Sequence, residues 1–126
     1  MKRIANILDR EGSFVILRDG NSLVPRIRLC SNNHIDLKYI AEKTNTPFKV
    51  TKAGQTTLTI WQNTLMEILP QIIPLMKNSL RLRKINLLLK AAVLNMGGIN
   101  EDTREKYFKE VFDKYNNIKI EEIRQK

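Results

Sequence analysis

Hydrophobic positions along this chain follow two different periods, and their order predicts a fold that combines helices with a sheet. Segments with apolar residues every three or four positions predict helices, and segments with strict alternation predict strands. The order helix, hairpin, helix, hairpin and further helices places the strands in two antiparallel pairs. The expected helices are residues 3–11, 34–44, 63–73, 79–95 and 101–115, and the expected strands are residues 13–18, 22–30, 48–52 and 56–61.

Residues with special backbone preferences mark the boundaries of these elements. Asp19-Gly20-Asn21 is a strong signal for the turn of the first hairpin. Pro70 is expected to shorten or kink the helix that contains it, because proline has no N–H for the helical ladder. Gly97-Gly98 ends the longest helix, and the polar residues from Asn116 onward predict a short, weakly held helix.

The expected strands form an antiparallel sheet with one face against helices and one face free. The residues expected to face the helices are Phe14, Ile16, Ile27, Leu29, Phe48, Val50, Leu58 and Ile60. The residues expected on the free face are Ser13, Val15, Leu17, Arg26, Arg28, Lys49, Thr51, Thr57, Thr59 and Trp61. The free face therefore carries three cations and no acid, which predicts a surface for a polyanion.

Nucleic acid is the polyanion that suits a free sheet face, because a twisted ribbon of strands enters the major groove. Arg26 and Arg28 are the candidates for guanine recognition, whereas Lys49 and Lys52 are expected to contact phosphates. Trp61 either stacks on a base or covers an edge of the sheet. The alternative interpretation is that these are the ordinary polar residues of a half-solvated sheet.

The overall charge supports a polyanionic partner. The 126 residues correspond to one domain, residues 1–126, with a net charge of +9. Residues 1–98 carry fifteen basic and six acidic side chains, whereas the stretch from Ile99 onward carries seven of each. Because the excess is confined to one part of the chain, it favours a binding face over a surface that is only solubilising.

The cysteine content and the hydropathy of the sequence limit the compartment and the kinds of site that we expect. Cys30 is the single cysteine, which excludes an intramolecular disulfide, and Cys30 with His34 is too small a set for a zinc site. A reducing compartment is expected. No signal peptide is expected, and the apolar stretch at residues 65–76 is too short to span a bilayer.

The segment at residues 77–90 is basic and contains no acid. Its cations are Lys77, Arg81, Arg83, Lys84 and Lys90. A cation held near a scissile phosphate stabilises the charge that develops during hydrolysis, and Arg81 and Arg83 are the candidates. Non-specific phosphate binding, or a solvated helix face, explains the segment equally well.

Glu11 is a candidate metal ligand, because it ends the first helix just before Gly12 and the first strand. Magnesium takes one or two carboxylates together with phosphate oxygens, and it activates water for phosphodiester hydrolysis. One acid per subunit is a poor site, so two copies would have to meet through their first helices. Asp9 cannot share a helix face with Glu11, and we expect it to make local hydrogen bonds that shape the turn.

The stretch Ile4-Ala5-Asn6-Ile7-Leu8-Asp9-Arg10-Glu11-Gly12 resembles, position for position, the motif of the LAGLIDADG homing endonucleases, which cut double-stranded DNA. The resemblance implies an α+β fold of order αββαββα, with a four-stranded antiparallel, saddle-shaped sheet and helices on one face. It also implies a Mg²⁺-dependent homodimer acting inside the cell, in the cytoplasm of a prokaryote or in an organelle, with no membrane and no small-molecule cofactor.

The resemblance further implies roles for individual residues. The metal ligands would be Glu11 and Gly12, and the catalytic residues would be Glu11, Arg81 and Arg83. The dimer interface would contain Ile4, Ala5, Asn6, Ile7 and Arg10. The DNA-binding residues would be those of the free sheet face together with Lys52.

The sequence departs from the family at two motif positions that are normally small and here hold Asn6 and Arg10. The helices then separate further, or Arg10 tilts outward, or the dimer is altered. Two other functions stay open: a non-catalytic relative that binds DNA or RNA in splicing or transcription, and an interaction module whose charge only aids solubility.

Overall fold

The structure, a computed structural model, describes residues 1–20 and 22–125. The elements are α1 (Lys2–Glu11), β1 (Ser13–Asp19), β2 (Ser22–Ser31), α2 (His34–Thr44), β3 (Phe48–Val50), β4 (Thr56–Ile60), α3 (Gln62–Ile72), the 3₁₀ helix η1 (Ile73–Leu75), α4 (Ser79–Asn95) and α5 (Glu101–Gln125). This is the predicted order. The expected turn joins β1 to β2, although Asn21 lies outside the described residues.

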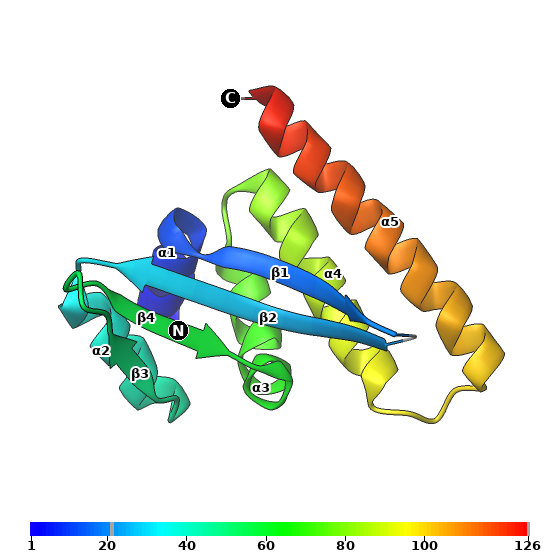
Figure 1. Ribbon diagram of the computed structural model, residues 1–126, viewed down its shortest axis with the longest axis horizontal. Helices are drawn as coiled ribbons and strands as arrows, with labels where there is room; N and C mark the ends of the chain where they lie inside the picture. Colours follow the sequence, from blue (N-terminus) through cyan, green and yellow to red (C-terminus); the bar gives the residue numbers. More distant parts are fainter. Residues whose placement is uncertain (21, 126) are drawn as a thin grey trace.

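The strands form one antiparallel sheet in the order β1-β2-β4-β3. Figure 1 shows α1, α3 and α4 behind this sheet, while its other face is open. Cross-strand partners share a face, so the register Ser13↔Arg28 and Arg28↔Thr59 places these three residues together. The predicted α+β architecture, with helices on one face of a four-stranded sheet, is confirmed.

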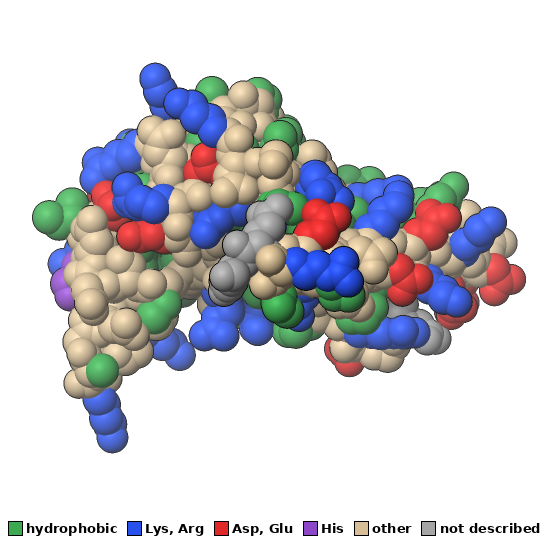
Figure 2. All heavy atoms as spheres, turned by 90° about the horizontal axis from the view of Figure 1, so that it is seen from above, with side chains coloured by type: hydrophobic (Ala, Val, Ile, Leu, Met, Phe, Trp, Pro, Cys, Tyr) green, Lys and Arg blue, Asp and Glu red, His purple; other side chains and the backbone are tan. Residues whose placement is uncertain are grey.

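Charge is distributed unevenly over this fold. Figure 2 shows blue and red side chains interspersed where α5 lies, whereas blue side chains predominate around the end that carries His34. This matches the sequence, in which the net positive charge precedes α5. The basic part of the surface therefore belongs to the sheet and the helices before α5.

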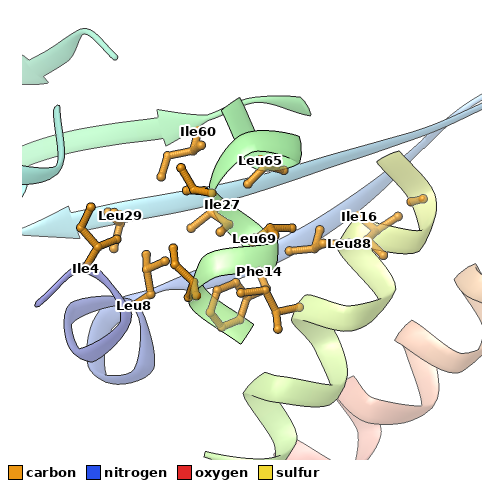
Figure 3. Packing of buried hydrophobic residues seen from close by; sticks show 14 of the residues in the cluster. Ile4, Leu8, Phe14, Ile16, Ile27, Leu29, Ile60, Leu65, Leu69 and Leu88 are labelled. Atoms are coloured by element: carbon orange, nitrogen blue, oxygen red, sulfur yellow. The ribbon is translucent and has the colours of Figure 1, made fainter. Parts of the chain in front are cut away.

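The hydrophobic core lies between the sheet and the helices behind it (Figure 3). Ile4 and Leu8 of α1 point toward the strands, and each is at most 1% exposed. Phe14, at 2% exposure, packs in the same cluster. Burying each such side chain contributes about 1.5–3 kcal/mol. The core thus fixes α1 and the start of β1 relative to each other.

The second hairpin differs from the prediction. Phe48 and Val50 were expected to face the helices, but their side chains are 38% and 60% exposed. The reason is that β3 has only three residues and lies at the sheet edge, where β4 is its one partner strand. The inward face of the sheet is buried in β1, β2 and β4, and the core ends there.

The region from α3 to η1 stays helical although it contains two prolines. Pro70 lies inside α3, which continues to Ile72, and Pro74 begins η1. Proline is therefore tolerated near this helix end rather than breaking the helix at once. Among the described residues, no helix combines the length and the apolar character needed to cross a bilayer.

The last helix is longer than predicted. α5 continues without a break to Gln125, where the sequence suggested a weakly held tail after residue 115. Ile118 is 3% exposed, so the tail contributes to the core. Arg83 pairs with Glu121 and Lys84 pairs with Glu122, both with N···O distances of 2.8 Å. These tertiary contacts hold a segment whose own sequence gives little helical signal.

Candidate metal-binding carboxylate and nucleic-acid interface

Glu11 lies where α1 ends, and Gly12 allows the sharp passage into β1. The Gly12 N–H donates to the Leu8 carbonyl at 3.0 Å. A Cβ at Gly12 would stand 2.8 Å from that carbonyl oxygen and 3.2 Å from the Phe14 ring. Because Gly12 has an ordinary extended backbone, its requirement is space rather than an unusual φ. The close approach fixes the position from which Glu11 extends.

Two long-range contacts, which we call the α1–α4 clasp, hold the end of α1 against the start of α4. The Asp9 carboxylate accepts the backbone N–H groups of Lys77 and Asn78, each at 3.1 Å. In return, Arg81 Nη1 donates to the Leu8 carbonyl at 2.8 Å. The local hydrogen bonds expected for Asp9 are thus replaced by contacts nearly seventy residues away in sequence.

The Glu11 carboxylate itself is incompletely satisfied. Its side chain is 27% exposed, and Oε1 lies 3.6 Å from Arg10 Nε. Oε2 is buried and has no hydrogen-bond partner among the described residues. A buried carboxylate oxygen without a partner is costly, so a donor or cation that binds here would favour a rotamer of Glu11 that exposes this oxygen.

The structure separates the two candidate arginines. Arg81 and Arg83 are two positions apart on α4, so they project in nearly opposite directions. Arg81 reaches the end of α1, whereas Arg83 contacts Glu121 with both Nη atoms at 2.8 and 3.4 Å. The hydrogen bond that Arg83 donates to the Glu121 carboxylate raises the pKa of Arg83. Arg83 is thus paired on the α5 side and Arg81 lies at the end of α1, and a catalytic role for either arginine stays a prediction.

Much of the basic segment is used within the fold. Arg81 binds the Leu8 carbonyl, and Arg83 and Lys84 pair with α5. Lys90 Nζ lies 5.7 Å from the centre of the Tyr107 ring. The sequence offered a cation near a phosphate, non-specific phosphate binding or a solvated helix face, whereas four of these five cations make contacts within the fold.

A metal ion held at Glu11 would need ligands from outside this chain. Among the described residues, no group of three or more His, Cys, Asp or Glu side chains could hold a metal ion. The carboxylate of Asp9, two residues away, is occupied by backbone N–H groups. Cys30 and His34 contact Gln55 and Thr56, respectively. Phosphate oxygens and a second acid are the groups that would complete a magnesium site at Glu11.

The free face of the sheet starts next to Glu11. Ser13 pairs with Arg28, and Val15 pairs with Arg26, so both arginines lie on the face that Ser13 opens. Lys49 and Thr57 are partners further along the same face. The strand also extends to Asp19, one residue beyond its expected end, which places an acid at the far tip.

Some predicted contact residues do not lie on a strand. Thr51 and Lys52 belong to the loop between β3 and β4, where the Thr51 N–H donates to the Gln55 carbonyl at 2.7 Å. Trp61 precedes α3 and is 52% exposed, with the Arg26 guanidinium 5.7 Å from its ring centre. Their assignment to strand positions is corrected, because β3 and β4 are shorter than the alternation indicated. Sequence reasoning also left Val24 out of the contact set, although it pairs with Leu17.

The five residues expected at a dimer interface divide into two groups. Ile4, Ala5 and Ile7 are at most 2% exposed because they belong to the core of this subunit, so they offer no surface to a partner. Asn6 and Arg10 are exposed. Arg10 turns outward to Asp36 at 2.9 Å, which was one of the three outcomes expected for this position.

Comparison with solved structures shows that the fold of this chain is similar to that of homing endonucleases. The chain superposes on I-CvuI in complex with the I-CreI target, with a TM-score of 0.73 and 14% identity over 93% of this chain and 80% of that chain. It superposes on I-SmaMI bound to an uncleaved DNA target with a TM-score of 0.64 and 16% identity, over 94% of this chain but 42% of that chain. For the archaeal intron-encoded homing endonuclease I-Vdi141I in complex with DNA, the TM-score is 0.61 and the identity 17%, over 75% and 67%.

The chain therefore has the fold of the LAGLIDADG homing endonucleases, as the motif resemblance implied. No protein-family model matches the sequence, and no curated protein matches it significantly. The chain spans less than half of I-SmaMI and most of I-CvuI.

Proposed function

We propose that this chain is a DNA-binding unit of a metal-dependent endonuclease that cuts double-stranded DNA at a specific sequence. The observation that carries the proposal is the position of Glu11 directly before β1, whose outward residues share a face with Arg26 and Arg28. An acid at the start of a basic sheet is suited to hold a cation beside a bound backbone.

Different residues of this chain would have different roles in this function. Arg26 and Arg28 would read base edges in the major groove, and Lys49 and Lys52 would contact phosphates. Arg81 and Asp9 would keep the end of α1 in place, so that the partly exposed Glu11 side chain would reach a metal at the start of the sheet. When bound, magnesium would supply an activated water and stabilise the leaving oxygen. Gly12 lies beside Glu11, and its role as a metal ligand remains a prediction.

Hydrolysis requires more than Glu11, because one carboxylate is a sparse site for magnesium. A second acid would come from a second unit of the same fold. The sequence predicts a second copy of this chain for that purpose.

Cleavage of a randomised library of long duplexes in the presence of Mg²⁺ tests the proposal. Wild-type protein should cut a defined subset of sequences, and E11Q should bind that subset without cutting it. Affinity for duplex DNA should fall steeply with salt, because phosphate contacts release counterions. Absence of any salt-dependent duplex affinity would eliminate both nuclease and DNA-binding functions and favour an interaction module.

A second candidate function is DNA or RNA binding without cutting. One contact favours it: Arg10 Nε lies 3.6 Å from Glu11 Oε1 and offsets the negative charge that a metal ion needs. The same library separates the two candidates, since specific binding without cleavage by the wild-type protein supports this second function.

A further inference from the structure

The open face of the sheet carries an apolar pair of side chains beyond its arginines. Leu17 of β1 and Val24 of β2 are cross-strand partners, and we call this pair the apolar row. Their neighbours Ile16 and Leu23 are 2% and 3% exposed and belong to the core. Alternation along the strands therefore places the apolar row on the open face, together with Arg26. Leu17 is 42% exposed, so this apolar surface is accessible.

The apolar row lies on the two-stranded part of the sheet. β4 pairs with Ile27–Ser31 of β2, and beyond that stretch β1 and β2 run side by side toward their turn (Figure 1). A two-stranded ribbon fits the major groove of B-DNA, where its side chains reach the edges of the bases. The row is thus placed to meet base edges when a duplex lies on the open face.

Successive cross-strand pairs on the open face differ in chemistry. The pair beside Glu11 is Ser13 with Arg28, the next is Val15 with Arg26, and the apolar row follows. Residues two apart on a strand are separated by about 6.6 Å, which is close to two base-pair steps of about 3.4 Å. The base pair that meets the apolar row should therefore lie about two steps beyond the one that meets Arg26, on the side away from Glu11.

The chemistry of the apolar row limits what it can recognise. Leucine and valine side chains have no polar atom, so the row cannot read a base by hydrogen bonds. In the major groove, the apolar group that distinguishes a base is the C5 methyl of thymine. 5-Methylcytosine carries a methyl at the same ring position, whereas uracil and cytosine lack it. The row is therefore suited to the methyl group of a pyrimidine.

The charge of the open face favours duplex DNA over a protein as the occupant of the apolar row. Arg26 and Arg28 precede the row along β2, and Lys49 lies further along the same face. A protein segment seated on the row would also cover Arg26, and burial of a cation without a partner is costly. A duplex brings phosphates for the cations and methyl groups for the apolar row at the same time.

We propose that the apolar row recognises the C5 methyl of a pyrimidine, so that one position of the target accepts thymine or 5-methylcytosine and disfavours cytosine. The proposal rests on the proposed function, because it requires a duplex on the open face of the sheet. It adds a position that is read by methyl contact to those read by the arginines. It also makes recognition of the target sensitive to cytosine methylation.

Sequence selection from three randomised duplex libraries, without Mg²⁺ so that nothing is cut, tests the proposal. The first library contains the four ordinary bases, the second has uracil in place of thymine, and the third has 5-methylcytosine in place of cytosine. From the first, wild-type protein should enrich thymine about two base pairs from an enriched guanine. The uracil library should lose this preference and keep the guanine, and the third library should enrich 5-methylcytosine beside thymine.

A single selected duplex gives the size of the effect. Exchange of uracil for thymine at this position should weaken the affinity about fourfold, which is the effect of one buried methyl group. L17S/V24S should bind both duplexes equally, because the apolar row is gone. V93S/I123S is the matched control and should keep the difference, since Val93 and Ile123 are 48% and 70% exposed on helices outside the sheet. Circular dichroism verifies folding, and V24S replaces the double variant if that variant does not fold.

Two results would overturn the proposal: equal affinity of wild-type protein for the thymine and uracil duplexes, or a thymine preference that persists in L17S/V24S. The outcome for the proposed function is read separately. Absence of salt-dependent affinity for any duplex would refute the proposed function and the methyl recognition together. Salt-dependent affinity with an enriched guanine but without an effect of the methyl group would refute the methyl recognition alone.

Discussion

Asp9 and Glu11 are two carboxylates near the same helix end, and they differ in their hydrogen-bond partners. Asp9 accepts two backbone N–H groups from the segment before α4. Glu11 keeps a buried oxygen that has no partner among the described residues. A carboxylate that is satisfied by the backbone contributes to stability, whereas one that is left unsatisfied is available for a ligand. The contrast separates an acid that the fold uses for its own structure from the acid that we propose as a metal ligand.

The largest effect is expected from E11Q, which removes the charge of the unsatisfied acid and keeps its shape. Cleavage should fall by roughly 100-fold or more, because metal-assisted stabilisation is worth several kcal/mol. Duplex affinity should change by no more than about twofold, since a single position outside the groove contacts carries little of the binding. Single-turnover kinetics measure the cleavage rate, and equilibrium binding to the same duplex measures the affinity. A parallel loss of cleavage and affinity in E11Q would contradict a specific role of Glu11 in cleavage.

The next largest effect is expected from G12A, because the turn that follows Asp9 and Glu11 has no room for a side chain. G12A places a Cβ 2.8 Å from the Leu8 carbonyl oxygen, a backbone atom that cannot move independently. Unfolding free energy should fall by about 1–3 kcal/mol through overpacking. S13A is the control, because Ser13 is exposed, and it should leave stability nearly unchanged. Urea denaturation of the three proteins gives the comparison, and equal stability of G12A and wild type would contradict the steric argument.

D9N addresses the structural acid directly. Asparagine keeps one acceptor but turns its amide NH₂ group toward the other of the two backbone N–H groups. The variant should therefore lose about 1–2 kcal/mol of stability. E11Q should lose less than D9N, because Oε2 has no partner to forfeit and the Arg10 contact of Oε1 is long and partly exposed. Thermal or urea unfolding of D9N and E11Q side by side sharpens the contrast. If E11Q were the less stable of the two, the assignment of roles would be reversed.

The smallest effect is expected from the arginines of α4. R81M removes the donor to the Leu8 carbonyl and should cost about 0.5–1.5 kcal/mol. It should also slow cleavage, because the end of α1 loses part of the α1–α4 clasp. R83M breaks the exposed pair with Glu121, which is worth about 0–1 kcal/mol, and should leave cleavage unchanged. A cleavage defect in R83M equal to that of R81M would restore a catalytic role to both.

The sequence predicted the order of the elements, the open sheet and Glu11 at its start, because these follow from short-range periodicity and turn residues. Alternation assigned the inward faces of β1, β2 and β4 correctly. At Phe48 and Val50 it gave the face, which they share with Leu58 and Thr56, but not the burial, since alternation shows which side a residue faces and not whether anything covers that side. Burial at a sheet edge depends on elements distant in sequence.

The clasp and the paired arginines could not be predicted for the same reason. Asp9 and its N–H partners are almost seventy positions apart, and nothing at either end of the sequence indicates the other. The pairing of Arg10 with Asp36 likewise depends on how α1 and α2 lie against each other. The sequence left Arg81 and Arg83 as equal candidates, and their different partners became visible only in the fold.

α5 also affects how strongly this protein can hold a polyanion. Its last turns bring Glu121 and Glu122 onto Arg83 and Lys84, so two of the cations of α4 already have carboxylate partners. A shorter helix would free them to attract phosphate at sites unrelated to the sheet. For the DNA binding that we propose, the length of α5 would therefore limit attraction of phosphate away from the sheet and leave recognition to the strands.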